Sequence, residues 1–407
     1  MKVYFKEIPF DQFTPITAYY ALATKGSCIL ESAPGSGRFS FVGIDPMAKI
    51  EGVGNYPEAL RTMMEDFPVE IDHPSALYTG APIGFVTFEK EYFFQIYRSS
   101  VIFDHELGKA FLATIGREEE VERLFHKLNR PLLLPDIQLS FGSIEEDVSD
   151  EEYCQMVEGA KEFMRRGDVY QVVLSRKFQA KMDGDPFQLY RAVRMKVPAP
   201  YLFFFDLEDR AVIGASPEKV ISVEGDRIEA APIAGTCKNG ESIEALLKDP
   251  KETMEHVMLV DLARNDIGAV SLPGSVQVTE FKKAVKFPSV THLVSKVVGK
   301  LDPQFDRLDA FQAAFPAGTL SGAPKKRAQE LLFNMEKKKR GLYGGAILAL
   351  TRKGDLASCI VIRTAVIQGG MMTVQAGAGI VLDSNPQKEA EETRNKASTL
   401  LKVATCF

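Results

Sequence analysis

The sequence lacks the features that would assign it to a membrane or secreted class. It has no apolar run near the roughly 18 residues that a membrane span needs. The most apolar cluster worth noting is the short run Tyr201–Phe205. The first residues, Met1–Glu7, contain no apolar stretch with a small-residue cleavage site, so they do not resemble a secretory signal. We therefore expect a cytoplasmic protein with no membrane partner.

Cysteine is scarce and scattered. The 407 residues include 5 cysteines, an odd number, and none of them stands in a C-x-x-C arrangement. This pattern excludes a disulfide framework and a cysteine zinc site. We expect buried free thiols.

Nucleotide-binding motifs and an excess of positive charge are also missing. Gly377 and Gly379 lack a third glycine at the spacing of a dinucleotide fingerprint, and no P-loop occurs. The net charge is −6 and the pI is near 5.6, which argues against a nucleic-acid partner. The basic run Lys337–Arg340 ends a helical pattern just before Gly341, and we interpret it as a solvated helix end.

What the sequence contains is typical of a globular protein. Apolar residues make up 45% and charged residues 26%, and the length allows two or three domains. A proline-bearing stretch leads to the acidic run Glu145–Asp147, where we place a soft boundary. This predicts an N-terminal region, residues 1–145, and a second region, residues 146–407.

The second region mixes helices with antiparallel strands. Ser149 and Glu152 form a capping box that predicts a helix, and Asp249-Pro250 and Asn385-Pro386 each open another. Strands are predicted at residues 169–180, 201–206, 211–216 and 219–224, and Gly225-Asp226 is a two-residue hairpin turn into residues 227–233. Regular βαβ alternation is missing, so the predicted class is α+β.

A repeated E-x-x-E spacing is the most informative pattern. Glu252 and Glu255 lie three apart in one predicted helix, and Glu389 and Glu392 lie three apart in another, so each pair shares a helix face. Taken alone, each pair is an ordinary solvated surface. If the two faces meet, the four carboxylates repel one another unless a cation lies between them. Oxygen ligands of this kind favour Mg²⁺.

A series of distinctive runs lies in order between about residues 150 and 405. They are Gly167–Ser175, Ala215–Glu218, Pro232–Thr236, Glu255–Asp266, Thr291–Leu293, Phe315–Lys325, Gly341–Gly345, Ile362–Thr364 and Gly377–Lys396. In these runs the chain resembles the chorismate-utilizing enzymes, and most closely anthranilate synthase component I. The resemblance implies a four-layer α/β/α/β sandwich of two large, mostly antiparallel sheets, with the active site between them and Mg²⁺ as the metal. It implies Glu255 and Glu392 as direct ligands, with Glu252 and Glu389 acting mostly through water.

The same resemblance implies roles at the substrate. Glu218 matches the general acid that protonates the departing C4 hydroxyl, a task that needs a raised carboxyl pKa. His292 matches a histidine that assists pyruvate elimination or positions the substrate. The implied contacts to the two carboxylates of chorismate and to its ring are Thr319, Tyr343, Arg363, Lys396 and the backbone near Gly377 and Gly379.

Two positions distinguish members of this family. Members that add water carry a lysine base where this chain has Gln171, and ammonia needs no such base. Many 4-amino-4-deoxychorismate synthases carry a nucleophilic lysine where this chain has Ala234. We therefore expect ammonia to attack C2 and pyruvate to leave, giving anthranilate, the first step of tryptophan biosynthesis. The alternatives are 4-amino-4-deoxychorismate synthase component I and a non-enzymatic chorismate-binding regulatory protein.

The resemblance also implies two partners. Ile29–Ser32 is similar to the family's inhibitor motif, so Glu31 and Ser32, with Pro200 and Tyr201, are expected to bind tryptophan as a feedback inhibitor. An ordinary strand end explains the same residues equally well. The chain has no cysteine in the glycine-flanked elbow of a glutaminase and no matching histidine run, so ammonia is expected from a separate glutamine amidotransferase subunit, component II.

Overall fold

A computed structural model describes residues 1–33, 37–70, 78–238, 242–286 and 290–403. The helices in that part are α1 (Pro15–Leu22), α2 (Tyr56–Asp66), α3 (Glu118–Leu128), α4 (Asp150–Arg165), α5 (Pro186–Lys196), α6 (Ile243–Lys248), α7 (Pro250–Gly268), α8 (Arg307–Ala314), α9 (Gly318–Ser321), α10 (Lys325–Met335) and α11 (Pro386–Leu401).

The strands carry more of the chain than the helices do. They are β1 (Val3–Ile8), β2 (Cys28–Ser32), β3 (Phe39–Val53), β4 (Pro82–Val86), β5 (Glu91–Asp104), β6 (Lys109–Ile115), β7 (Ser140–Phe141), β8 (Glu145–Glu146), β9 (Gln171–Asp183), β10 (Tyr201–Asp206), β11 (Arg210–Ser216), β12 (Lys219–Glu224), β13 (Arg227–Ala230), β14 (Ile233–Lys238), β15 (Gln277–Lys286), β16 (Val290–Lys300), β17 (Gly322–Ala323), β18 (Ala346–Leu350), β19 (Leu356–Ile360), β20 (Thr364–Gln368) and β21 (Met371–Ile380).

Antiparallel pairing connects the described strands into one continuous network. Its order is β9-β21-β20-β11-β10-β2-β3-β5-β4-β18-β19-β12-β13-β16. β6 and β1 continue from the second half of β5, while β14 and β15 flank β16. Strands from both sides of residue 145 pair directly, β2 with β10 and β4 with β18. The domain boundary near that residue stays a prediction.

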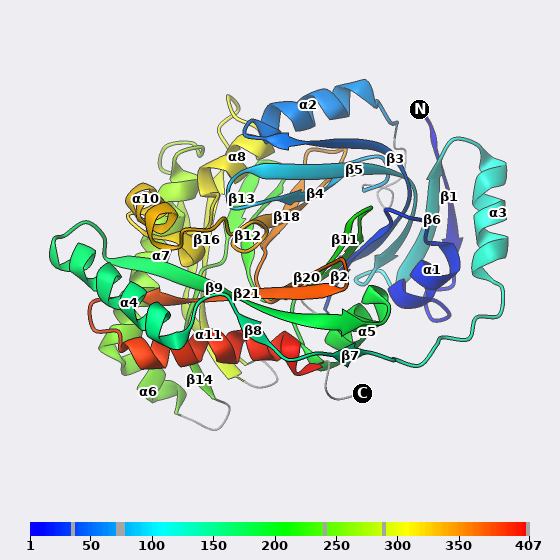
Figure 1. Ribbon diagram of the computed structural model, residues 1–407. Helices are drawn as coiled ribbons and strands as arrows, with labels where there is room; N and C mark the ends of the chain where they lie inside the picture. The colour runs from blue at the N-terminus through cyan, green and yellow to red at the C-terminus, as the bar shows by residue number, and fades with distance from the viewer. Residues whose placement is uncertain (34–36, 71–77, 239–241, 287–289, 404–407) are drawn as a thin grey trace.

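The network folds into two facing layers (Figure 1). One layer contains β3, β4 and β5, with α2 outside it; the other contains β9, β21 and β20, with α4 and α11 outside it. A cluster of strand residues fills the space between the layers, with Phe85, Phe203 and Ile347 among its members. Each large apolar side chain buried in this way contributes about 1.5–3 kcal/mol. The predicted α+β class with large antiparallel sheets and flanking helices is confirmed.

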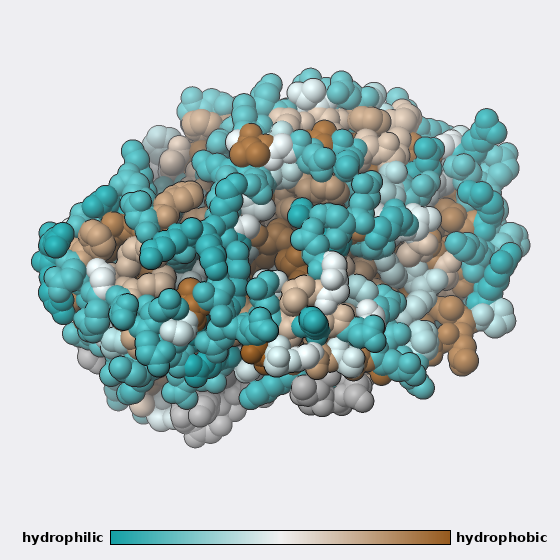
Figure 2. All heavy atoms as spheres, in the orientation of Figure 1, coloured by the Kyte–Doolittle hydropathy of each residue, from teal (hydrophilic) through white to brown (hydrophobic). Residues whose placement is uncertain are grey.

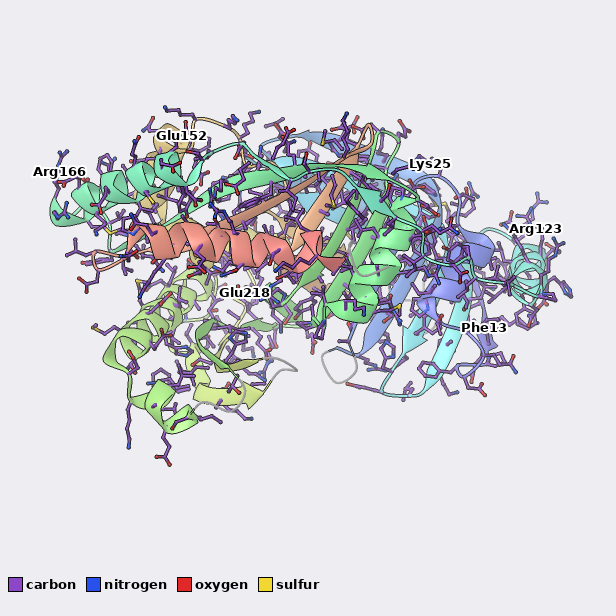
Figure 3. The ribbon with its side chains drawn as sticks, turned by 60° about the horizontal axis from the view of Figure 1, so that its bottom comes forward. Phe13, Lys25, Arg123, Glu152, Arg166 and Glu218 are labelled. Carbon is purple, nitrogen blue, oxygen red and sulfur yellow. The ribbon has the colours of Figure 1, made fainter. Side chains whose placement is uncertain are left out.

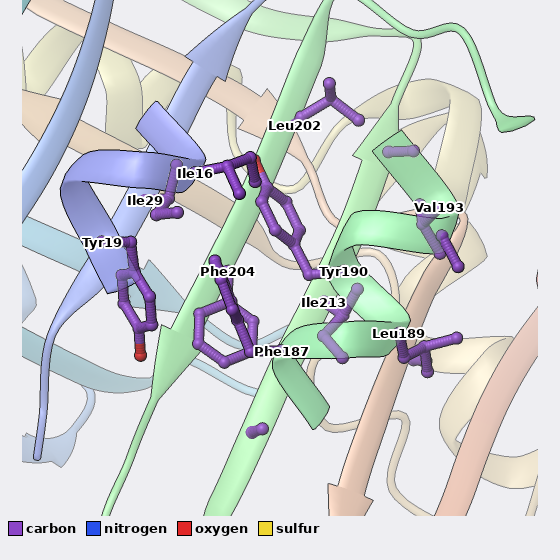
Figure 4. Close-up of a cluster of buried hydrophobic side chains, with 14 of the residues drawn as sticks. Ile16, Tyr19, Ile29, Phe187, Leu189, Tyr190, Val193, Leu202, Phe204 and Ile213 are labelled. Atoms are coloured by element: carbon purple, nitrogen blue, oxygen red, sulfur yellow. The ribbon is translucent and has the colours of Figure 1, made fainter. Parts of the chain in front are cut away.

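A second core lies on the outer face of the sheet, under α1 and α5. Figure 4 shows Tyr19 and Ile16 of α1 beside Phe187 and Tyr190 of α5, with both helices on the same face of the strands β2, β10 and β11. The rings of Tyr19 and Phe187 stack with centroids 4.1 Å apart. This packing holds α5 beside α1 over β10 and β11, where Tyr190 and Arg194 of α5 reach the Glu31 carboxylate of β2.

Local sequence signals set the helix starts. The Ser149 hydroxyl accepts from the Glu152 amide, and the Glu152 side chain accepts from the Ser149 amide, so the predicted capping box begins α4. Asn385 caps α11 by accepting from the Lys388 amide. The hairpin at 225–226 joins β12 to β13 as predicted. The predicted strand 227–233 is divided into β13 and β14, and the break falls at Pro232, which cannot donate to a ladder.

Two adjacent crossovers carry the chain from one layer to the other. Residues 216–219 join β11 to β12, and residues 360–364 join β19 to β20. They run side by side, because the Ala215 amide donates to the Arg363 carbonyl at 3.1 Å and the Ile360 amide donates to the Glu218 carbonyl at 2.9 Å. Glu218 and Arg363 are therefore placed together where the layers meet.

The visible surface is largely hydrophilic (Figure 2). Apolar residues gather in a hollow near the middle of that face, between the two layers. Within the ranges that the structure covers, every helix is too short or too polar to cross a bilayer.

Candidate active site

Glu218 lies at the crossover between β11 and β12, beneath α11 in Figure 3. The Thr319 hydroxyl, from the first turn of α9, donates a hydrogen bond of 2.9 Å to Glu218 Oε1. Burial raises the pKa of the Glu218 carboxyl to about 7, although the Thr319 hydrogen bond and the charges of Lys396 and Arg363 oppose the rise. This carboxyl can therefore hold a proton near neutral pH.

Arg363 occupies the neighbouring crossover with a left-handed backbone, φ 47°. A non-glycine residue rarely adopts this conformation, so the surrounding structure must hold it there. Burial lowers the pKa of the guanidinium, and the nearby Glu218 charge opposes that shift. The structure thus brings together a predicted acid and a predicted carboxylate-binding cation.

Strands β9 and β21 form the other wall of the site. Gly377 pairs with Ser175 and Gly379 pairs with Val173. A Cβ added at Gly377 would lie 2.7 Å from Tyr343 Oη and 2.5 Å from the Leu174 carbonyl oxygen; one at Gly379 would lie 2.6 Å from Gln171 Nε2. A side chain at position 377 would clash with the Leu174 backbone, whereas one at position 379 would force the Gln171 amide to shift.

The side chain of Gln171, on β9, forms a hydrogen bond with a residue of α7. Its Nε2 donates a hydrogen bond of 3.2 Å to Glu255 Oε1, and its Oε1 is buried without a hydrogen-bond partner. The side chain is only 4% exposed. A buried polar atom without a partner is costly, so this oxygen is available to a ligand, water or ion in the site.

Lys396 and Glu392 approach the same strand pair from α11. Lys396 Nζ lies 2.6 Å from Glu392 Oε1 and donates a hydrogen bond of 3.0 Å to the Gly377 carbonyl oxygen. Both side chains are about half exposed. The two glutamates predicted as direct ligands, Glu255 and Glu392, therefore each lie next to side chains that contact the β9–β21 wall.

His292 lies in β16 and pairs with Thr236 of β14. Burial lowers the pKa of its imidazole, a hydrogen bond to the Gly235 backbone opposes the shift, and the charge of Arg363 adds to it. The neutral form is favoured, so the ring can accept a proton. The Glu252 carboxylate is close by, because a Cβ at Gly235 would lie 3.3 Å from Glu252 Oε2.

The four glutamates do not form a ready-made cluster. Among the residues that the structure describes, no three His, Cys, Asp or Glu side chains are placed to share a metal ion. Glu389, in the first turn of α11, is half-buried and lies within electrostatic range of Tyr153. Mg²⁺ usually takes one or two carboxylates and keeps several waters. Of the predicted direct ligands, Glu255 contacts Gln171 and Glu392 contacts Lys396, and the Mg²⁺ site stays a prediction.

Comparison with known proteins decides the family. The family model "chorismate binding enzyme" matches residues 85–402. The chain belongs to that family. It is 38% identical to anthranilate synthase component 1 of Lactococcus lactis, over 98% of this chain and 99% of that one. The crystal structure of anthranilate synthase component I from Streptococcus pneumoniae superposes with a TM-score of 0.82 at 36% identity, covering 97% and 99% of the two chains.

A more distant structure shares the fold. The menaquinone-specific isochorismate synthase of Escherichia coli superposes with a TM-score of 0.83 at 20% identity, covering 99% of this chain and 94% of that one. The chain is thus an enzyme of the chorismate-binding family. The roles of its individual site residues stay predictions.

A second pocket, of about 610 Å³, lies between the layers, and Glu218 is not among its lining residues. Its lining includes Leu30, Ser32, Tyr201, Lys219, Ile347 and Cys359. Tyr201 pairs with Ser32, so the two segments predicted to bind an inhibitor lie side by side. Pro200 accepts the Ala33 amide at 3.2 Å beside this pocket.

Glu31 also borders the pocket, but its carboxylate is engaged elsewhere. Arg194 Nε donates to both of its oxygens at 2.9 Å, and the Tyr190 hydroxyl donates at 2.5 Å. Successive strand residues point to opposite faces. The Glu31 side chain therefore points to α5, while its neighbours Leu30 and Ser32 can face the pocket.

Sequence reasoning missed two ion pairs, one partly buried and one fully buried. Lys325 Nζ lies 2.8 Å from Asp266 Oδ2 beside a cavity of about 50 Å³ that Glu218 and Thr319 also line. Arg340 pairs with Glu336 and is only 4% exposed, so the interpretation of the whole basic run as a solvated helix end was wrong. Lys337–Lys339 are exposed, but Arg340 turns inward.

The side chain of Ala234, which lies in β14, is outside the described part.

Proposed function

We propose that this enzyme converts chorismate and ammonia into anthranilate and pyruvate, the first step of tryptophan biosynthesis. The observation that carries the proposal is the buried Gln171 side chain, a neutral amide held by Glu255 in the wall of the site. An amide cannot deprotonate water, whereas neutral ammonia attacks without a base. The anthranilate synthase names of the relatives support the same reaction.

The substrate carboxylates would be bound by cations and donors from both walls. Arg363 and Tyr343 would take the enolpyruvyl carboxylate, with the backbone of Gly377 and Gly379, and Lys396 would reach the ring carboxylate. Burial lowers the pKa of the Arg363 guanidinium but leaves it charged near neutral pH. These contacts orient C2 toward Gln171 and the C4 hydroxyl toward Glu218.

Proton transfers would fall to Glu218 and His292. Ammonia forms a bond to C2 while the C4 hydroxyl leaves as water with the proton of Glu218, whose pKa of about 7 keeps that proton available. Thr319 orients the carboxyl by donating to Oε1. The nitrogen now bound to C2 gives up its surplus proton, which restores the proton that Glu218 lost. In the second step neutral His292, the base we assign, removes the C2 proton while the C3–O bond breaks. The released enolpyruvate takes up one proton at its methylene carbon and becomes pyruvate.

Mg²⁺ is part of this proposal. Glu255 and Glu392 would hold the ion, with Glu252 and Glu389 acting through water. When bound, the ion would neutralise the ring carboxylate and make the ring a better electron sink.

The ammonia source and the regulator complete the proposal. The sequence offers no glutaminase nucleophile, so a separate glutamine amidotransferase subunit would supply ammonia from glutamine. The relatives' designation as component 1 supports a second component. Tryptophan would inhibit the enzyme from the 610 Å³ pocket, whose size suits a drug-sized or amino-acid ligand.

A turnover assay tests the proposal. The purified chain should form a fluorescent product from chorismate, Mg²⁺ and ammonium salts at alkaline pH, where more free ammonia exists, and should fail with glutamine alone. Chorismate binding without turnover would favour a regulatory binding protein. A non-fluorescent aminated product would identify the 4-amino-4-deoxychorismate reaction instead, and turnover with glutamine alone would refute the separate subunit.

A further inference from the structure

A buried ion pair connects three parts of the site wall. Arg340 Nε and Nη2 each lie 2.7 Å from an oxygen of Glu336, and the two side chains are 2% and 6% exposed. Arg340 Nη1 donates to the Leu320 carbonyl at 2.6 Å, and Nη2 donates to the Val173 carbonyl. The guanidinium also lies over the ring of Tyr343, 5.6 Å from its centroid.

The Arg340–Glu336 pair binds the edge of β9 that faces away from β21. It occupies part of that edge in place of a neighbouring strand. Strand β17 covers that edge at Gln171 and Val172 only. Beyond it, Arg340 binds the Val173 carbonyl, and Glu336 Oε1 accepts from both the amide and the hydroxyl of Ser175 at 2.8 Å. An uncovered buried edge would leave these backbone groups unsatisfied. The two side chains therefore act as a short surrogate strand.

The residues held in this way are those that shape the substrate wall. Val173 pairs with Gly379 and Ser175 pairs with Gly377, the two glycines that face Gln171 and Tyr343. Leu320 is the residue after Thr319, which orients Glu218. One guanidinium thus contacts the strand opposite the glycines, the helix that carries Thr319, and the Tyr343 ring.

We propose that Arg340 and Glu336 are positioning residues that set the spacing between Tyr343, the Gly377–Gly379 backbone and Thr319, and thereby the affinity for the substrate's enolpyruvyl carboxylate. The inference rests on the proposed function for the identity of that substrate. Neither residue touches the substrate. Their effect is geometric, since a displacement of about 1 Å can cost about a hundredfold in catalytic efficiency.

Steady-state kinetics test the functional part. Arg340→Lys keeps the charge but loses the planar fork, so the KM for chorismate should rise about tenfold while kcat changes less. Arg307→Lys is the matched control, because Arg307 is also buried and donates to two carbonyls, those of Thr351 and Asp355, which are not among the contacts of Arg340. It should lose comparable thermal stability at unchanged KM. Equal KM values in the two variants would overturn the proposal.

A milder variant covers the case in which Arg340→Lys fails to fold. Ser175→Ala removes one donor to Glu336 and also the acceptor for Gln375 Nε2, and it leaves the backbone contact to Glu336 in place. Its KM should rise about two- to threefold, in line with the loss of these hydrogen bonds. An unchanged KM would count against the role of the pair.

Hydrogen exchange tests the geometric part without turnover. In Arg340→Lys and in Glu336→Gln, the amides of β9 around Ser175 should exchange faster than in wild type, while Arg307→Lys leaves them unchanged. Wild-type exchange rates in both variants would overturn the surrogate strand. If wild type fails to turn over chorismate, the proposed function fails, and the exchange result still decides whether the pair holds β9.

Discussion

The side-chain amide of Gln171 on β9 donates a hydrogen bond of 3.2 Å to the carboxylate of Glu255 on α7. The two residues are 84 positions apart, and the contact places a neutral donor in the wall of the site. A lysine in the same place would face a carboxylate, so its charge and its ability to act as a base would depend on the state of Glu255.

Gln171→Lys is expected to keep the fold and to allow some addition of water to chorismate. A lysine there can lose its proton and serve as a base, so the hydroxylated product should increase as pH rises. Chromatography of the products with and without ammonium measures the ratio. Gln171→Met, which has similar length and no base, is the control and should give no hydroxylated product. If Gln171→Lys gives none at any pH, this residue is not the switch between nucleophiles.

Glu218→Gln is expected to lower kcat about 10²- to 10⁴-fold, because the amide cannot donate a proton to the departing hydroxyl. Thr319→Val should have a smaller effect, since it removes only the hydrogen bond to Glu218 Oε1. Stopped-flow and steady-state rates with purified variants of matched thermal stability measure both effects. A Glu218→Gln variant with wild-type kcat would exclude Glu218 as the acid.

The pKa of Glu218 predicts a pH dependence. Burial raises it from 4.5 to about 7, and the acid must be protonated to act, so kcat/KM at constant free ammonia should fall above about pH 7. The same shift means that protonation of Glu218 stabilises the fold fully below about pH 4.5, and that this contribution is lost as pH rises through about 7. Both trends should vanish in Glu218→Gln. A flat kcat/KM profile from pH 6 to 9 in wild type would contradict the assignment.

Removal of either predicted direct ligand should abolish Mg²⁺-dependent activity. Glu255→Ala and Glu392→Ala each remove one carboxylate ligand from a site that has few direct protein ligands. Glu252→Ala and Glu389→Ala should reduce activity less, because these carboxylates act through water. Glu391→Ala is the matched control. Glu391 is an exposed neighbour of Glu392 on α11, and its replacement should leave Mg²⁺-dependent activity unchanged. Mg²⁺ titrations of initial rates distinguish these classes. Undiminished turnover in either direct-ligand variant would remove the metal assignment.

Tryptophan is expected to inhibit wild type through the pocket beside Ser32. Ser32→Ala should weaken inhibition about two- to tenfold by the loss of one hydrogen bond. Thr24→Ala, whose side chain lies outside this pocket, should leave inhibition unchanged. Titration of initial rates with tryptophan provides the measurement. Full activity at millimolar tryptophan would mean that the Ile29–Ser32 motif is structural only.

Local signals made part of the fold predictable. The capping box at Ser149, the hairpin after Glu224 and the proline-opened helix α11 depend on residues within a few positions of one another, and all three are confirmed.

Contacts between residues far apart in the chain could not be predicted from the sequence. Nothing near Arg340 indicates that it binds the Val173 carbonyl 167 positions away, so its burial was missed. The engagement of Glu31 by Arg194, 163 positions away, was equally hidden. Such pairings depend on how distant elements pack, which periodicity does not encode. Only the resemblance to known enzymes placed Glu218, Arg363 and His292 in one site.

The central claim is that this site adds ammonia to chorismate and eliminates pyruvate. The most direct test supplies nitrogen-15-labelled ammonium, chorismate and Mg²⁺ to the purified chain and identifies the products by mass spectrometry. The account predicts anthranilate carrying one labelled nitrogen, together with an equal amount of pyruvate. An unlabelled hydroxylated product, or a labelled product formed without pyruvate, would contradict it.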